Sequence, residues 1–292
     1  MFQNIAEDAK QEEYEDVKEV NKKLYIKRLF SIPNIILYAI SFMLSMVSFG
    51  TELAPFGLAI FVATCSNKIP SGIVFVAVGI GTLIKFGPSG LLMYILTVLV
   101  FMALVLIFRP KYEYAERNEK QKLGKYILIA ILLVQVAKMF FTMFLVYNLL
   151  TAIMLSITTY IFYKIFSNSI IVVKEFGVKQ AFSIEEVMGA ALMLSIAFSS
   201  LKGLTVFSLS ITNILSIMLI LFLGWKHGML VGGTAGITIG MVLGIITSSS
   251  PILVAAYAIS RNDCRNIKQI RTNRSNHRIL LGKCTYYIFY KW

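Results

Sequence analysis

Residue types that carry catalysis or bind metals are scarce in this chain of 292 residues. Its two histidines are His227 and His277, and its three cysteines are Cys65, Cys264 and Cys284. These residues lack the spacing of a zinc site, a CxxC motif or a disulfide framework. The sequence also contains no HExxH helix, Walker loop, GxSxG turn or paired-aspartate metal site. We therefore expect no catalytic, metal-binding or cofactor-binding residue in this chain.

One lysine stands out because apolar residues surround it. Lys138 lies near the middle of a long apolar stretch. A cation at the centre of a membrane span costs about 2.5 kcal/mol or more on insertion scales. Lys138 could serve transport or proton relay, or it could pair with a carbonyl or an acid, or reach the membrane surface if the span boundary shifts. We favour pairing or reach to the membrane surface over transport or proton relay, because no acid is clearly placed at mid-span to complete a relay.

Ser183 and Glu186 have the spacing of a capping box. In this motif the serine hydroxyl accepts from the backbone of the third helical residue, and the glutamate side chain accepts from the backbone of the serine. The pair predicts the start of a helix, and it accounts for the adjacent acids Glu185 and Glu186 without a catalytic role.

Glycines recur at every fourth position near the predicted ninth span. Small residues let membrane helices approach closely, so the series favours helix packing; a substrate path lined by flexible backbone is the alternative. The series comprises Gly224, Gly228, Gly232, Gly236, Gly240 and Gly244.

Composition indicates which elements must position these residues. The chain is 57% hydrophobic and 15% charged, with a mean hydropathy of +0.75, whereas soluble domains carry about 25% charged residues. The apolar residues fall in blocks, many near the length of about 20 residues that crosses a bilayer as a helix. We therefore predict an all-α fold, a polytopic transmembrane bundle of about nine to ten spans.

The breaks between apolar blocks give the expected spans. We place the division of the stretch from Tyr126 to Val173 near Tyr147, and Leu53–Cys65 is either a short tilted span or one arm of a re-entrant hairpin. The other expected spans are Leu29–Phe49, Ile69–Ile84, Leu91–Phe108, Val187–Ser200, Phe207–Leu223, Met229–Thr247 and a tenth that begins at Pro251 and stops at Ile259.

Lysine and arginine bias predicts the orientation. With a cytoplasmic N-terminus, the loop Arg109–Lys125, the loop around Lys174 and the Lys226–His227 turn all fall in the cytoplasm. Lys68 and Lys202 are exceptions. We expect a multi-pass protein of the cell membrane whose partner is the lipid bilayer. Since insertion topology accounts for the net charge of +13, we expect no nucleic-acid partner.

Charge and apolar content divide the chain into three parts. Residues 1–28 form a charged cytoplasmic segment, 29–260 the membrane domain and 261–292 a basic tail. The tail holds eight Lys and Arg residues against one Asp. Its codons are compatible with a shifted reading frame that continues an apolar helix, so we interpret it as frameshift-derived; a native basic tail is the alternative.

Several segments resemble the membrane region of stage II sporulation protein E. The resemblance covers roughly residues 30–260. The segments are Glu52–Ala59, Ser183–Leu201, Asn213–Ser216, Leu223–Gly228, Gly232–Ile246 and Ser250–Ser260.

The resemblance implies a membrane region that precedes a PP2C-type serine phosphatase domain. In that family the phosphatase uses Mn²⁺ or Mg²⁺ and acts at the asymmetric division septum in sigma-factor activation, with self-association and contact to cell-division proteins. No position here matches the catalytic motifs, so we expect an anchor and assembly region truncated before the catalytic domain, and inactive as an enzyme. The alternative is a small-molecule transporter or a transporter subunit.

Overall fold

The computed structural model describes residues 31–47, 55–67, 69–108, 116–141, 145–175, 182–202, 204–206 and 209–247. The expected tenth span, the charged N-terminal segment and the basic tail lie outside these residues. Apart from one pair of two-residue strands, the regular structure of the described part is helical. Its elements are α2 (Ile32–Ser45), α3 (Pro55–Ser66), α4 (Ser71–Ile107), α5 (Glu116–Phe141), α6 (Val146–Lys174), α7 (Ile184–Ser199), β1 (Thr205–Val206), β2 (Leu209–Ser210), α8 (Ile211–His227) and α9 (Met229–Thr247).

The longest helix, α4, is broken in its middle. Gly87 has φ 70° and ψ −165°, which an L side chain rarely adopts, and Pro88 follows with no N–H to continue the helix. Tyr94 stacks on Phe75 with ring centroids 5.4 Å apart, and its hydroxyl donates to the Phe75 carbonyl at 3.3 Å. In a straight helix, residues 19 apart would be separated by about 28 Å. The chain therefore folds back at Gly87, and the two arms correspond to the expected spans Ile69–Ile84 and Leu91–Phe108.

Helix α3 lies inside the bundle. Ten of its 12 residues are buried. Phe56 packs edge-on against Phe162 of α6, with ring centroids 4.7 Å apart. A helix that is apolar all round has no side suited to water, so it belongs in the interior of a bundle. The expected piece Leu53–Cys65 is thus present as a short helix enclosed largely by protein.

Two predicted boundaries are wrong by several residues. The break in the stretch from Tyr126 to Val173 falls between Phe141 and Val146, earlier than Tyr147. The expected span from Phe207 begins at Ile211, because the residues before it form the β1–β2 pair, in which Thr205 faces Ser210.

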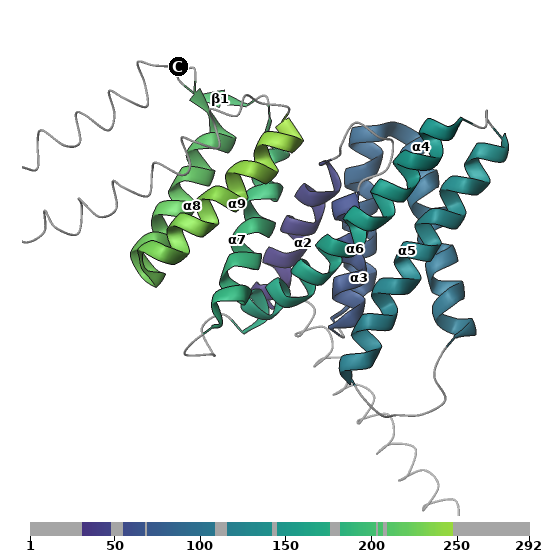
Figure 1. Ribbon diagram of the computed structural model, residues 1–292, viewed down its shortest axis with the longest axis horizontal. Coiled ribbons are helices and arrows are strands. Elements are labelled where there is room, and N and C mark those ends of the chain that lie inside the picture. The colour runs from purple at the N-terminus through teal and green to yellow at the C-terminus, as the bar shows by residue number, and fades with distance from the viewer. Residues whose placement is uncertain are drawn as a thin grey trace, which may run out of the picture.

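Helices α2 to α7 all contribute to one large core. Helices α8 and α9 lie together beside α7 (Figure 1).

Three of the described helices are long and apolar enough to cross a membrane, judged by length and composition. They are Ser71–Ile107, Lys120–Phe141 and Val146–Lys174. The helical and apolar character is confirmed, but the count of nine to ten spans is not. The five other described helices are not among these candidates: α2, α3, α7, α8 and α9, of 14, 12, 16, 17 and 19 residues.

Candidate functional site: a basic pocket where helices α5, α6, α7 and α9 meet

Asn67 joins three helices where α3 ends. Its amide nitrogen donates to the Ala63 carbonyl at 2.9 Å and to the Ser167 carbonyl of α6 at 3.1 Å. Its amide oxygen accepts from the Lys120 ammonium of α5 at 3.1 Å. Because one side chain satisfies groups on all three helices, Asn67 fixes the start of α5 against the ends of α3 and α6.

Tyr163 forms a second connection at the same level. The side chain is buried, and its hydroxyl lies 2.6 Å from the Lys120 carbonyl and 3.2 Å from the Ser66 hydroxyl. A buried tyrosine hydroxyl needs such partners, since an unpaired polar group in an apolar interior is costly. We call Ser66, Asn67, Lys120, Tyr163 and Ser167 the polar cluster.

Gly124 lets α5 lie directly on the aromatic side of α6. A Cβ at this position would stand 2.8 Å from ring carbons of both Tyr160 and Tyr163. No real side chain fits at that distance, so glycine is required for this approach. The close contact brings Lys120, one turn before Gly124, beside the polar face of α6.

A pocket of about 620 Å³ opens beside the polar cluster, among α5, α6, α7 and α9. Its charged residues are Lys120, Lys164 and Glu185. The Lys164 ammonium lies 5.7 Å from the centre of the Tyr160 ring, within the range of a cation–π interaction. Three apolar side chains also line it: Ile165, Met188 and Leu192. The remaining lining residues are Gln121, Tyr160, Tyr163, Ser167, Asn168, Gly189 and Thr238.

The first turn of α7 places Glu185 at this pocket. Both hydrogen bonds of the capping box are present: the Glu186 backbone donates to the Ser183 hydroxyl at 3.2 Å, and the Ser183 backbone donates to the Glu186 carboxylate at 2.9 Å. One turn later, a Cβ on Gly189 would lie 2.7 Å from the Ser169 hydroxyl, so α7 and α6 are also in close contact.

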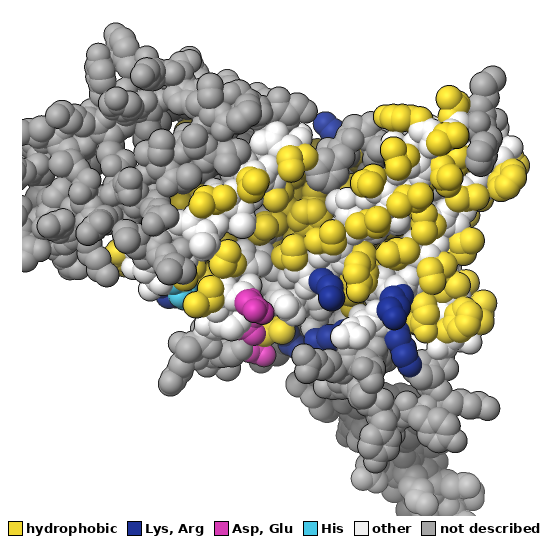
Figure 2. Space-filling model, in the orientation of Figure 1, with side chains coloured by type: hydrophobic (Ala, Val, Ile, Leu, Met, Phe, Trp, Pro, Cys, Tyr) yellow, Lys and Arg dark blue, Asp and Glu magenta, His cyan; other side chains and the backbone are white. Residues whose placement is uncertain are grey.

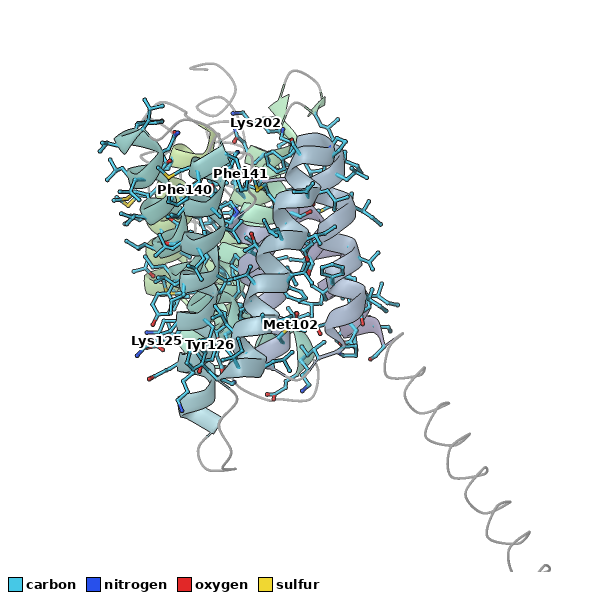
Figure 3. All side chains as sticks on the ribbon, turned by 90° about the vertical axis from the view of Figure 1, so that its right-hand side faces the viewer. Met102, Lys125, Tyr126, Phe140, Phe141 and Lys202 are labelled. Atoms are coloured by element: carbon cyan, nitrogen blue, oxygen red, sulfur yellow. The ribbon has the colours of Figure 1, made fainter. Side chains whose placement is uncertain are left out.

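Figure 2 shows basic side chains gathered toward one end of the helices, with an acidic group nearby and a largely apolar surface beyond them. Lys125 and Tyr126 lie at one end of α5, whereas Phe140 and Phe141 lie at the other, together with Lys202 (Figure 3). The pocket therefore belongs to the end of the bundle that carries Lys120 and Lys125.

The glycine series does not form one stripe along one helix. Gly224 is in α8, and Gly228 has φ 91° in the turn that separates α8 from α9. Gly232 of α9 faces Gly224, because a Cβ on it would stand 2.6 Å from the Gly224 Cα. The two glycines four residues either side of the turn thus let α8 and α9 touch. Gly236, Gly240 and Gly244 continue along α9, the first two of them buried.

Lys138 lies in the last turn of α5, three residues before the helix ends at Phe141. A cation in the last turn is favoured by the exposed carbonyls and the helix dipole. This placement favours the explanations in which Lys138 reaches a carbonyl or the membrane surface.

Other candidate residues do not converge. Cys65 sits at the end of α3, Lys85 is exposed in the α4 reversal and His227 is exposed at the end of α8. Within the described ranges, no three His, Cys, Asp or Glu residues lie close enough to hold a metal ion. Glu52, His277, Cys264 and Cys284 lie outside the described residues.

Sequence reasoning misses Asn67, Tyr163 and Lys164. Lys164 has a recognisable signal, since it is a cation within an apolar stretch and follows two tyrosines by one and four residues. Asn67 and Tyr163 have none, because only the packing of α3, α5 and α6 shows that they share partners.

Comparison with protein families gives one finding. A family model described as SpoIIE, N-terminal domain, matches residues 2–260, which include every helix from α2 to α9. No curated protein and no solved structure matches the chain.

Proposed function

The chain belongs to the SpoIIE family through its N-terminal domain, and from this premise we propose that it anchors a PP2C-type serine phosphatase in the cell membrane at the asymmetric division septum. The phosphatase and its Mn²⁺ or Mg²⁺ belong to a separate catalytic domain of the family. In this proposal, the membrane region positions the phosphatase at the septum and supports its assembly, and the phosphatase domain acts in sigma-factor activation.

The apolar outer surface is the observation that best supports the anchoring function. Phe141 is 91% exposed, Val146 76% and Ile107 73%. Apolar surface of this kind over long helices is unfavourable in water and suited to lipid. The domain is therefore a membrane-anchoring region of its family.

The orientation and the number of crossings are part of the proposal. The end of the bundle that holds Lys120 and Lys125 is the cytoplasmic end, in accord with the bias of lysine and arginine toward the cytoplasm. In this arrangement, α3 and the two arms of α4 cross as members of the bundle even where a single helix is short. The N-terminal segment then also lies in the cytoplasm.

Self-association and contact with division proteins are proposed from family membership. The α8–α9 hairpin supports self-association, because it lies at one side of the bundle with Met218, Phe222 and Trp225 exposed. Large apolar and aromatic side chains of this kind are suited to contacts between membrane helices or with lipid.

Localisation in sporulating cells tests the proposal. A fluorescent protein fused to the 292-residue chain should resist alkaline extraction from membranes and should concentrate at the asymmetric septum. Even distribution over the whole membrane would contradict the septal role while leaving the anchoring function intact. Substrate-dependent flux in liposomes containing the purified chain would support the transporter alternative instead.

A further inference from the structure

The basic pocket lies where the charged and apolar parts of the bundle meet. Lys120 lines the pocket, and the apolar stretch of α5 begins shortly after it, at Tyr126. A pocket at this level can be reached from the lipid headgroup region. Its volume of about 620 Å³ also falls within the usual range for small-molecule sites, about 300–1,000 Å³.

The cations of the pocket are held in place. Lys120 donates to Asn67 at 3.1 Å, and Lys164 lies over Tyr160. Lys164 is ten residues before the end of α6, in a helix that is apolar enough to cross a membrane. A lysine within such a helix is costly unless it meets water, an acid or another partner, and the pocket beside Lys164 has room for an anionic partner.

The rest of the lining restricts the chemistry of that anion. Two lysines and Glu185 leave a net charge of +1, which matches a phosphodiester with one negative charge. Glu185, Gln121 and Asn168 can accept hydrogen bonds from hydroxyl groups beside the phosphate. The apolar side chains of Ile165, Met188 and Leu192 suit the glycerol backbone and the first carbons of acyl chains better than a free anion.

We propose that this pocket binds the headgroup of an anionic phospholipid of the phosphatidylglycerol class. The phosphate lies between Lys120 and Lys164, the glycerol hydroxyls face Glu185, and the acyl chains leave over the apolar residues. Basic pockets between membrane helices bind anionic headgroups in this way. The proposal requires membrane insertion but neither the septal role nor the phosphatase.

Native mass spectrometry of the full chain in neutral detergent tests the proposal, with an equimolar mixture of phosphatidylglycerol and phosphatidylcholine. We expect preferential binding of phosphatidylglycerol. A lysine near the membrane surface contributes about 1 kcal/mol to binding an anionic lipid, which corresponds to about a fivefold change in affinity. Lys164→Gln should therefore weaken binding about fivefold, and Lys120→Gln combined with Lys164→Gln should weaken it further.

Matched variants separate the pocket from general charge. Lys226→Gln removes one positive charge from an exposed position outside the pocket and should leave binding unchanged, and Lys164→Arg should retain it. The thermal unfolding midpoint of Lys164→Gln checks that the variant is folded. Equal losses in Lys164→Gln and Lys226→Gln, or equal binding of the two lipids, would overturn the proposal. Soluble glycerophosphoglycerol that displaces the lipid at equal concentration would show a site for free phosphodiesters and would also overturn it.

Discussion

The bundle of α2 to α6 and the α8–α9 hairpin are both made of apolar helices in close contact, but they are held together differently. The bundle buries large aromatic side chains such as Phe56, Tyr94 and Phe166, and it contains hydrogen bonds between helices. The hairpin has a smaller core with Ile220, Leu223 and Ala235, and its helices meet at two glycines. Lipid is as apolar as these side chains, so shape and contact decide helix association more than exclusion from solvent does.

Helix α7 separates the two cores and belongs to both. Met193 and Ile196 pack into the larger core, whereas Val187 and Ala191 pack against α8 and α9. Aromatic packing and polar connections therefore join the helices of the bundle, whereas close glycine contact joins α8 to α9 within the hairpin. Four substitutions test whether the two regions are held together in these different ways.

Phe56→Ala should have the largest effect. Phe56 is fully buried in the bundle and packs edge-on against Phe162. Removing a buried Phe side chain costs about 3–5 kcal/mol in soluble cores. We expect a marked drop in the thermal unfolding midpoint in detergent. Phe141→Ala, at a position 91% exposed, is the control and should leave the midpoint nearly unchanged. Equal midpoints for the two variants would show that aromatic packing does not hold the bundle.

Gly81→Ala should be the next most damaging substitution. A Cβ on Gly81 would collide with the Ser45 hydroxyl and lie 2.9 Å from the Phe42 carbonyl. Overpacking of this kind costs about 1–3 kcal/mol, because α2 and α4 must move apart. Gly72→Ala is the matched control, since nothing lies within 4 Å of its Cβ position. Thermal unfolding of the two variants should differ clearly; if Gly72→Ala destabilises the protein as much, close approach of α2 and α4 is not the cause.

Gly232→Ala should destabilise the protein by about 1 kcal/mol, at the low end of overpacking costs, and therefore less than Gly81→Ala. The new Cβ would meet the Gly224 backbone, but the hairpin lies at the side of the bundle and can shift outward. Limited proteolysis should show faster cleavage at the α8–α9 hairpin with little change in the bundle. Loss of protection throughout the chain would show instead that the hairpin and the bundle unfold as one unit.

Tyr163→Phe should have the smallest effect of the four. It removes the hydroxyl that bonds to Lys120 and Ser66 while keeping the ring in place. Hydrogen bonds between membrane helices contribute on average about 0.6 kcal/mol. We expect a small decrease in the unfolding midpoint, with none for Tyr147→Phe, whose side chain is 71% exposed. A change as large as that of Phe56→Ala would show that the polar cluster contributes as much to stability as aromatic packing does.

The sequence by itself predicts the helical and apolar character, the α7 capping box and the positions of most helices. It does so because apolar run length, glycine and proline breaks and capping residues act over a few neighbouring residues. The break at Gly87 illustrates this, since glycine permits the positive φ observed there and Pro88 lacks the N–H that a continuous helix would need. The same local signals misplace the start of α8, where the β1–β2 pair takes up residues that look like helix.

Only the tertiary structure decides which side chains share a site. Asn67, Lys120 and Ser167 are separated by dozens of residues, and their hydrogen bonds exist because α3, α5 and α6 come together at one level, where Gly124 lets α5 lie against α6. The glycine series shows the same limit: its regular spacing is visible in the sequence, but the turn at Gly228 places Gly224 and Gly232 on facing helices. Spacing along a chain specifies a face of one helix, whereas contact between helices depends on how the whole bundle packs.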